Sequence, residues 1–226
     1  MKKKVKQAPK PHRILLQAIV NALQVIFTEN KYADKVIEKT LKENSKFGGR
    51  DRRFVAETTY DIVRNYRLLN HLTKNADNYW EILGAHFILK HIHLPPEREF
   101  KDLNEKAILD AQKALNNQAV LQSYPDWLWD LCSKELGAAQ WETEAKALNH
   151  QAKVVLRVNT LKTKKEILIK HLAEKEIEVD ATPDFNDALI LRERQNVFAN
   201  ELFKLGLFEL QDAGSQAISE FLEVEP

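Results

Sequence analysis

The spacing of apolar positions divides the chain into two parts. From Ile14 to about Trp141, apolar residues recur every three or four positions. One such stripe consists of Ile14, Leu15, Ala18, Ile19, Ala22, Leu23 and Ile26. This spacing is typical of amphipathic helices, so it predicts an all-helical first part. Roughly six helices are delimited by breaks, which fall at Asn30, 47–50, 75–78, 94–96 and 116–117.

A further helix start is predicted at residues 123–126. Ser123 can cap the helix, Pro125 is tolerated in its first turn, and Asp126 favours the positive end of the helix dipole. Gly137 should end this helix.

After residue 151 the spacing becomes alternating. Residues 154–159 are rich in β-branched side chains, which is typical of a strand. A helix, two strands, a short helix and a last strand are then expected at 167–175, 177–180, 188–191, 197–203 and 207–210. Thr163 with Glu166 fits a capping box before the first of these helices, and Asn196 can cap the second. The order βαββαβ predicts a ferredoxin-like or RRM-like subdomain, a fold that serves many functions.

The predicted fold class is therefore multidomain, with α followed by α+β. We expect a basic tail over residues 1–12, a helical domain over 13–150 and an α+β subdomain over 151–226. The tail either binds phosphates or is simply solvated and disordered. Its cations, together with the one that follows it, are Lys2, Lys3, Lys4, Lys6, Lys10 and Arg13.

Composition narrows the classes of protein. A net charge of only +1 argues against a domain that coats nucleic acid indiscriminately, so any RNA contact must be local. No apolar run reaches membrane-spanning length and no signal peptide follows the N-terminal lysines, so we expect a cytoplasmic protein. The single cysteine, Cys132, can form neither an internal disulfide nor a zinc-binding pair. It shares a helix face with Leu128 and Leu136, and we interpret it as a core residue.

Four segments carry a resemblance to a known family. They are 50–55 leading into 60–64, 123–128, 156–162 and 206–216. Together they resemble the N-terminal part of the Sun/Fmu (RsmB-like) family of RNA cytosine-5 methyltransferases. The first segment is similar to the NusB-like helical domain of that family, and the others are similar to its substrate-recognition subdomain.

The resemblance implies an RNA-recruiting region of an S-adenosylmethionine (SAM)-dependent rRNA methyltransferase. In the family a Rossmann-like domain follows, binds SAM and supplies the cysteine that attacks cytosine. We expect this chain to stop before that domain, because its six glycines never form the Gly-x-Gly of a nucleotide-binding turn. The expected chain is then a monomer without a catalytic residue or cofactor of its own. Its expected partners are RNA, ribosomal by resemblance, and its own downstream catalytic domain.

The candidate RNA-binding residues of the helical part are Arg50, Arg52, Arg53, Arg64 and Arg67. If Asp51 caps a helix, Arg53, Arg64 and Arg67 fall at spacings that can share a face and follow an RNA backbone. Alternatively, the arginines pair internally with their acidic neighbours Asp51, Glu57 and Asp61. The sequence leaves both interpretations open.

The α+β part offers Arg157 and Asn159 on its first strand. They either contact RNA or bond to the turn at Gln211 and Asp212 and so hold the subdomain together. Asp212 is expected to cap the final helix. The residues expected at the domain junctions are Trp127, Gln211, Asp212 and Ser215.

Two other functions stay open beside the leading one. The first is a free-standing NusB-like RNA-binding module. The second is a helical protein-interaction domain without a nucleic-acid role. A metal site is not expected, because His86, His91 and His93 match no zinc spacing.

Overall fold

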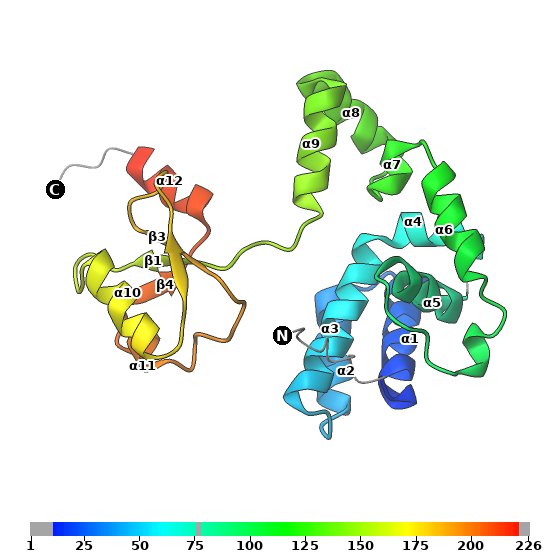
Figure 1. The fold of residues 1–226 in the computed structure, drawn as a ribbon, viewed down its shortest axis with the longest axis horizontal. Helices are drawn as coiled ribbons and strands as arrows, with labels where there is room; N and C mark the ends of the chain where they lie inside the picture. Colours follow the sequence, from blue (N-terminus) through cyan, green and yellow to red (C-terminus); the bar gives the residue numbers. More distant parts are fainter. Residues whose placement is uncertain (1–10, 76–77, 222–226) are drawn as a thin grey trace, which may run out of the picture. The chain divides into compact units, whose positions relative to one another are not determined.

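A computed structural model describes residues 11–75 and 78–221, apart from the side chains of residues 219 and 220. The chain forms two compact units, Met1–Asn149 and His150–Pro226. The first unit is built from helices and the second carries a small sheet (Figure 1). The predicted order of an α part followed by an α+β part is confirmed. The basic tail expected over residues 1–12 lies outside the described residues except for its last two positions.

The first unit is all-helical over its described residues, as predicted. Its elements are α1 Arg13–Thr28, α2 Ala33–Glu43, α3 Gly49–Arg64, α4 Tyr66–Thr73, α5 Tyr79–Leu89, the 3-10 turn η1 Arg98–Phe100, α6 Glu105–Ala114, α7 Gln118–Leu121, α8 Asp126–Leu136 and α9 Ala138–Leu148. The predicted breaks separate helices, but a further break at Asn65 divides one expected helix into α3 and α4. At that break, Asn65 Nδ2 donates to the carbonyl of Asp61, which is a local bond that competes with helix continuation.

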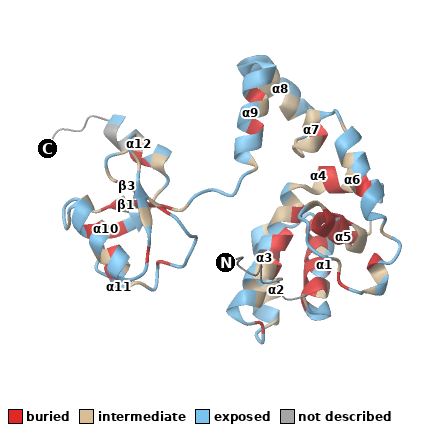
Figure 2. Ribbon diagram, viewed as in Figure 1, coloured by how far each residue is buried: buried red, intermediate tan, exposed pale blue. Residues whose placement is uncertain are grey.

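The core of the helical unit lies around α1 and α5. The α1 stripe predicted from the sequence supplies Ile19 and Leu23, both fully buried, but its first member, Ile14, is exposed. Helix α5 is buried on nearly every side (Figure 2), which explains why its residues lack a polar face. Gly84 lies in the middle of α5, where an added Cβ would stand 2.1 Å from Leu103 Cδ1. The glycine therefore allows the segment after α5 to pack closely against it.

Helix α8 begins at Asp126 and ends at Leu136, and the following Gly137 has a φ of 86°, which glycine reaches most readily. Both predicted ends are thus confirmed, but the predicted cap is wrong. Ser123 Oγ instead accepts a hydrogen bond of 3.0 Å from the backbone N–H of Leu68 on α4. The core interpretation of Cys132 is also wrong, because Cys132 is half-buried and no residue of α8 is fully buried (Figure 2).

The second unit has the predicted order βαββαβ followed by a helix. Its elements are β1 Val155–Val158, α10 Lys165–Glu174, β2 Val179–Ala181, β3 Ala188–Leu191, α11 Glu201–Lys204, β4 Phe208–Leu210 and α12 Ala213–Phe221. The strands form one antiparallel sheet in the order β2-β3-β1-β4, with Leu156 opposite Leu189 and Leu210. This is the order of a ferredoxin-like sheet, so the predicted fold of this part is confirmed.

The core of the second unit lies between the sheet and its helices. Leu156, Phe208, Leu168 and Leu172 are fully buried there, and the last two come from α10. The caps predicted for α10 and α11 are wrong, whereas Asp212 Oδ2 accepts from the N–H of Gly214 at the start of α12, as expected. Helix α10 starts after Lys164 without a side-chain cap, and Asn200 rather than Asn196 caps α11.

No helix among the described residues is long and apolar enough to cross a membrane.

Candidate nucleic-acid interface

The outer face of α3 carries a row of exposed side chains that we call the α3 stripe. Its members are Arg50, Arg53, Glu57, Tyr60 and Arg64, all of them exposed. Three- and four-residue steps bring these positions to one face of the helix. The opposite face holds Val55, Thr58, Thr59 and Ile62, which are buried. Because the buried face fixes the orientation of α3 on the core, the α3 stripe points to solvent.

The arginines of the α3 stripe are not used up by acidic neighbours. In the described part of the chain, no ion pair or hydrogen bond engages the side chain of Arg50 or Arg53. Arg64 Nη1 makes only a long contact of 3.4 Å to the carbonyl of Asn149. The nearby carboxylate of Asp61 pairs instead with Lys90 at 2.8 Å. The internal pairing that the sequence left open is therefore absent from these three arginines.

The other two candidate arginines have structural partners. Arg52 Nη1 donates to the carbonyl of Leu41 at 2.8 Å and so connects α3 to α2. Arg67 donates to the carbonyl of Tyr124 and to Asp126 Oδ1, the latter at 2.7 Å. Since α3 ends at Arg64, Arg67 belongs to another helix, and the face predicted for Arg53, Arg64 and Arg67 is not formed on one helix. Gly48, not Asp51, is the N-cap of α3.

Arg157 lies on β1 as expected, whereas Asn159 directly follows the strand, and both are bonded within their own unit. Arg157 Nη1 donates to Gln211 Oε1 at 3.0 Å, which connects β1 to the segment after β4. Asn159 Nδ2 donates to the carbonyl of Gly206 at 2.8 Å, and Asn159 Oδ1 accepts from the N–H of Leu161. Both side chains are half-buried and hold loops in place. This geometry favours the structural alternative over direct contact with RNA.

The residues expected at the domain junctions lie on two separate elements. Asp212 Oδ2 accepts from the N–H of Gly214 at 3.0 Å, at the start of α12. Gln211 is half-buried and its carbonyl accepts from the buried Gln216 Nε2, whereas Ser215 is exposed. Trp127 is 68% exposed on α8. The junction role of these residues stays a prediction.

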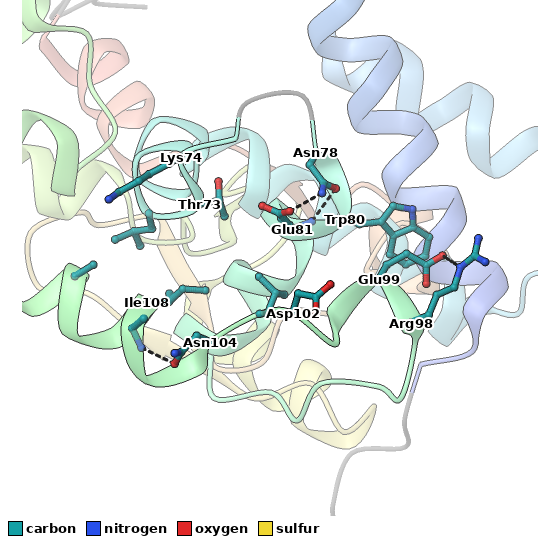
Figure 3. Close-up of a pocket in the computed structure, with 14 residues that line it drawn as sticks. Thr73, Lys74, Asn78, Trp80, Glu81, Arg98, Glu99, Asp102, Asn104 and Ile108 are labelled. Carbon is teal, nitrogen blue, oxygen red and sulfur yellow. Dashed lines mark hydrogen bonds and ion pairs between the residues drawn. The ribbon is translucent and has the colours of Figure 1, made fainter.

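A shallow pocket of about 550 Å³ opens beside α5 and α6 (Figure 3). Its charged lining is mostly acidic, with Glu81, Glu99 and Asp102 against Lys74 and Arg98. The excess of carboxylates disfavours a phosphate-bearing ligand. This pocket is therefore a poor site for RNA.

One ion-pair cluster beside the pocket orders the start of α1. Arg13 bonds to both Glu97 and Glu99 and lies 5.2 Å from the centroid of the Trp80 ring. The hydrogen bonds from Arg13 lower the pKa of Glu99 to about 2 and raise the pKa of Arg13. Arg13, one of the cations considered for phosphate binding, is thus already engaged by the carboxylates of Glu97 and Glu99.

The histidines do not form a metal site among the described residues, where no three potential ligands gather. His86 is buried in α5, and burial lowers its pKa to about 4 from an ordinary 6.5. The nearby Asp61 and Lys90 have opposing, smaller effects. His86 is therefore neutral at physiological pH and packs as part of the core.

The chain is similar to known proteins, over one segment by a family model and over most of its length by a relative. Residues 124–198 match the family model described as the ferredoxin-like domain of RsmF/B-like methyltransferases. Over 245 aligned positions the chain is 24% identical to the probable ribosomal RNA small subunit methyltransferase B of Synechocystis sp. (strain ATCC 27184 / PCC 6803 / Kazusa), covering 90% of this chain and 54% of that protein. The match at 124–198 and the similarity along most of the chain both point to rRNA methyltransferases of the RsmB/F type as the proteins that this chain resembles.

A solved structure has a fold similar to that of this chain. The crystal structure of PH0851 aligns with a TM-score of 0.64 at 20% identity, covering 98% of this chain and 57% of that chain. The chain thus spans about half the length of both relatives. The matched domain, 124–198, begins before the boundary at Asn149 and so includes α8 and α9.

Sequence reasoning missed Tyr60 as a surface residue of this region. Tyr60 was considered only within a segment of family resemblance, yet its side chain is 44% exposed among the arginines of the α3 stripe. The signal was available, because Arg53, Tyr60 and Arg64 are separated by seven and four residues. Recognising it required knowing which face of α3 points away from the core.

Proposed function

We propose that this chain is the RNA-recruiting region of a SAM-dependent rRNA (cytosine-5-)-methyltransferase. The α3 stripe binds the RNA backbone through Arg50, Arg53 and Arg64. The single observation that carries this proposal is the presence of three exposed arginines on one helix face without acidic partners. The name of the Synechocystis relative supports rRNA as the substrate class.

The physical basis is the release of counterions. Each arginine placed against a phosphate displaces condensed cations from the RNA, and the entropy of their release favours binding. An arginine already paired with a carboxylate would lose that partner on binding, and the gain would largely cancel. The unpaired state of Arg50 and Arg53 therefore makes them better phosphate ligands than Arg13 or Arg67.

The chemistry of methyl transfer belongs elsewhere in the whole protein. SAM needs a glycine-rich turn between a strand and a helix. The only adjacent glycines in the sequence are Gly48, the N-cap of α3, and Gly49, its first residue, and α3 follows another helix rather than a strand. The residues of this chain do not fit SAM. We propose that another domain binds SAM and receives a flipped cytosine, while this region, acting as a cytoplasmic monomer, holds the surrounding RNA.

The test is fluorescence anisotropy with a labelled ribosomal RNA hairpin, titrated with the protein across a salt series. We expect wild-type binding to weaken with salt, with a slope of log K against log salt of about −2 for three phosphate contacts. The triple reversal Arg50→Glu/Arg53→Glu/Arg64→Glu should weaken binding by roughly ten-fold or more at low salt.

A matched control separates the site from the overall charge. The reversal Lys101→Glu/Lys106→Glu/Lys113→Glu changes the net charge equally at exposed positions of another face. It should leave binding near the wild-type value. An equal loss of affinity in both triple variants, or none in the first, would show that the α3 stripe is not the binding face.

A protein-interaction domain is a second candidate, favoured by the surface of α8. Trp127, Leu131 and Leu136 are 68%, 49% and 45% exposed, which is unusual for large apolar side chains on one short helix. Absence of RNA binding at low salt would favour this function. A free-standing RNA-binding module would instead bind RNA as proposed but serve no catalytic domain.

A further inference from the structure

The α3 stripe contains an aromatic ring between its arginines. Tyr60 follows Arg53 by seven residues and precedes Arg64 by four, and all three lie on the same exposed face. The ring is 44% exposed although its neighbours Thr59 and Ile62 are fully buried. Tyr60 is therefore partly exposed to solvent and is not part of the buried core.

We propose that the α3 stripe recognises unpaired RNA, with a base stacked on Tyr60 and the flanking phosphates held by Arg53 and Arg64. This inference rests on the proposed function and specifies its ligand. An exposed ring next to cations is the combination used by proteins that bind single strands, because every base has a face that can stack while arginines follow the backbone.

The surroundings of Tyr60 favour this use of its ring. The adjacent Asp61 is paired with Lys90 at 2.8 Å, so its charge opposes an approaching phosphate less than a free carboxylate would. Thr59 Oγ1 is bonded to the carbonyl of Val55 within the helix. The ring is thus the group at this point of α3 that is left to meet a ligand.

The dimensions of the stripe agree with a short single strand. From Arg50 to Arg64 the helix rises ~21 Å, which corresponds to roughly six stacked nucleotides. Double-stranded RNA is a poorer fit, because its deep and narrow major groove does not admit a helix and its bases are not available for stacking. The α3 stripe should therefore prefer loops, bulges or single-stranded segments.

Glu57 gives the proposal a variant that improves binding. Its exposed carboxylate lies one turn from both Arg53 and Tyr60, and no ion pair neutralises it among the described residues. A phosphate held by Arg53 is repelled by this charge. Glu57→Gln should therefore tighten binding by roughly three-fold at low salt, an effect that salt should erase. A gain of affinity cannot arise from misfolding.

The experiment compares a single-stranded octanucleotide with the same sequence annealed to its complement, using anisotropy at low salt. One base carries 2-aminopurine, whose fluorescence falls on stacking. We expect preference for the single strand and quenching on binding. Tyr60→Leu should weaken binding by roughly ten-fold and abolish the quenching, and Tyr60→Phe should retain both.

The outcomes distinguish the two proposals. Failure of the wild-type protein to bind any RNA at low salt would overturn both of them. Binding that depends on the arginines but is equal for duplex and single strand, or unchanged in Tyr60→Leu, would overturn only the stacking proposal. Tyr60→Leu must first show the thermal unfolding temperature of the wild type. If Tyr60→Leu unfolds at a lower temperature, the other two variants test the stacking proposal. Tyr60→Phe should then keep the quenching, and Glu57→Gln should bind more tightly; loss of either result would overturn the proposal.

Discussion

The α3 stripe of the helical unit and the pair Arg157 and Asn159 of the α+β unit differ in their contacts. The helical unit has a core cluster of twenty buried residues, and the exposed face of α3 can carry arginines that have no role in packing. The smaller α+β unit has a main core cluster of ten buried residues. There Arg157 and Asn159 hold the strands and loops together. A small domain buries less apolar surface per residue, so hydrogen bonds of this kind matter more to its stability.

This difference guides the interpretation of charged residues in a sequence. Residue type placed Arg53 and Arg157 in the same class of candidate. Their contacts separate them, because the first has no partner among the described residues and the second bonds to Gln211. The predictions below test whether the helical unit depends on close packing and the α+β unit on polar bonds.

The largest expected effect comes from filling the close contact at Gly84. Gly84→Val should destabilise the helical unit by about 3 kcal/mol, because the added atoms must displace Leu103 and Phe100. All four tryptophans lie in the helical unit, so urea unfolding followed by tryptophan fluorescence reports on it. The control Gly49→Val changes the first residue of α3, where an added Cβ meets nothing within 4 Å. Equal unfolding midpoints for the two variants would contradict close packing at α5.

The next effect is the pH dependence caused by His86. Its pKa is about 4 in the folded protein and 6.5 ordinarily, so the unfolded chain binds a proton first as the pH falls. The contribution of neutral His86 to the free energy of unfolding is therefore fully present above pH 6.5 and is lost progressively between pH 6.5 and pH 4. The loss between pH 7 and pH 5 should be about 2 kcal/mol. His86→Leu should flatten this part of the urea-midpoint profile, whereas the exposed His93→Gln should not.

The smallest effect concerns Asn159 in the α+β unit. Asn159→Asp keeps the acceptor for Leu161 but loses the donor to Gly206, and Asn159→Ala loses both. We expect about 1 kcal/mol of destabilisation for each lost bond. Hydrogen exchange of peptides from residues 155–210 should rise in the order wild type, Asp, Ala. RNA binding should stay unchanged, and a large loss of RNA affinity without faster exchange would instead support direct contact by Asn159.

The order of elements was predictable because it depends on local spacing. The apolar run at 188–191 coincides with β3, and Gly137, expected to end a helix, adopts a positive φ. Helix caps were less predictable. Asn196 and Asn200 offer the same side chain four residues apart, and it is Asn200 that accepts from the N–H of the buried Leu202 and caps α11.

The candidate site was predictable as a segment but not as a surface. The sequence indicated arginines around residues 50–67, yet it could not show that Arg52 reaches Leu41 or that Arg67 reaches Tyr124. Those bonds join residues far apart along the chain. Local spacing alone also could not reveal the break at Asn65, which separates Arg67 from the helix of Arg53 and Arg64.

The position of β1 in its sheet has a consequence for how the protein folds during synthesis. β1 is the first strand to be made, yet it pairs with β3 and with β4, the last strand of the sheet. A ribosome must therefore release nearly the whole α+β unit before β1 has both neighbours, whereas α1, α2 and α3 pack on one another soon after they emerge. We expect the helical unit to fold before β1 pairs with β3 and β4.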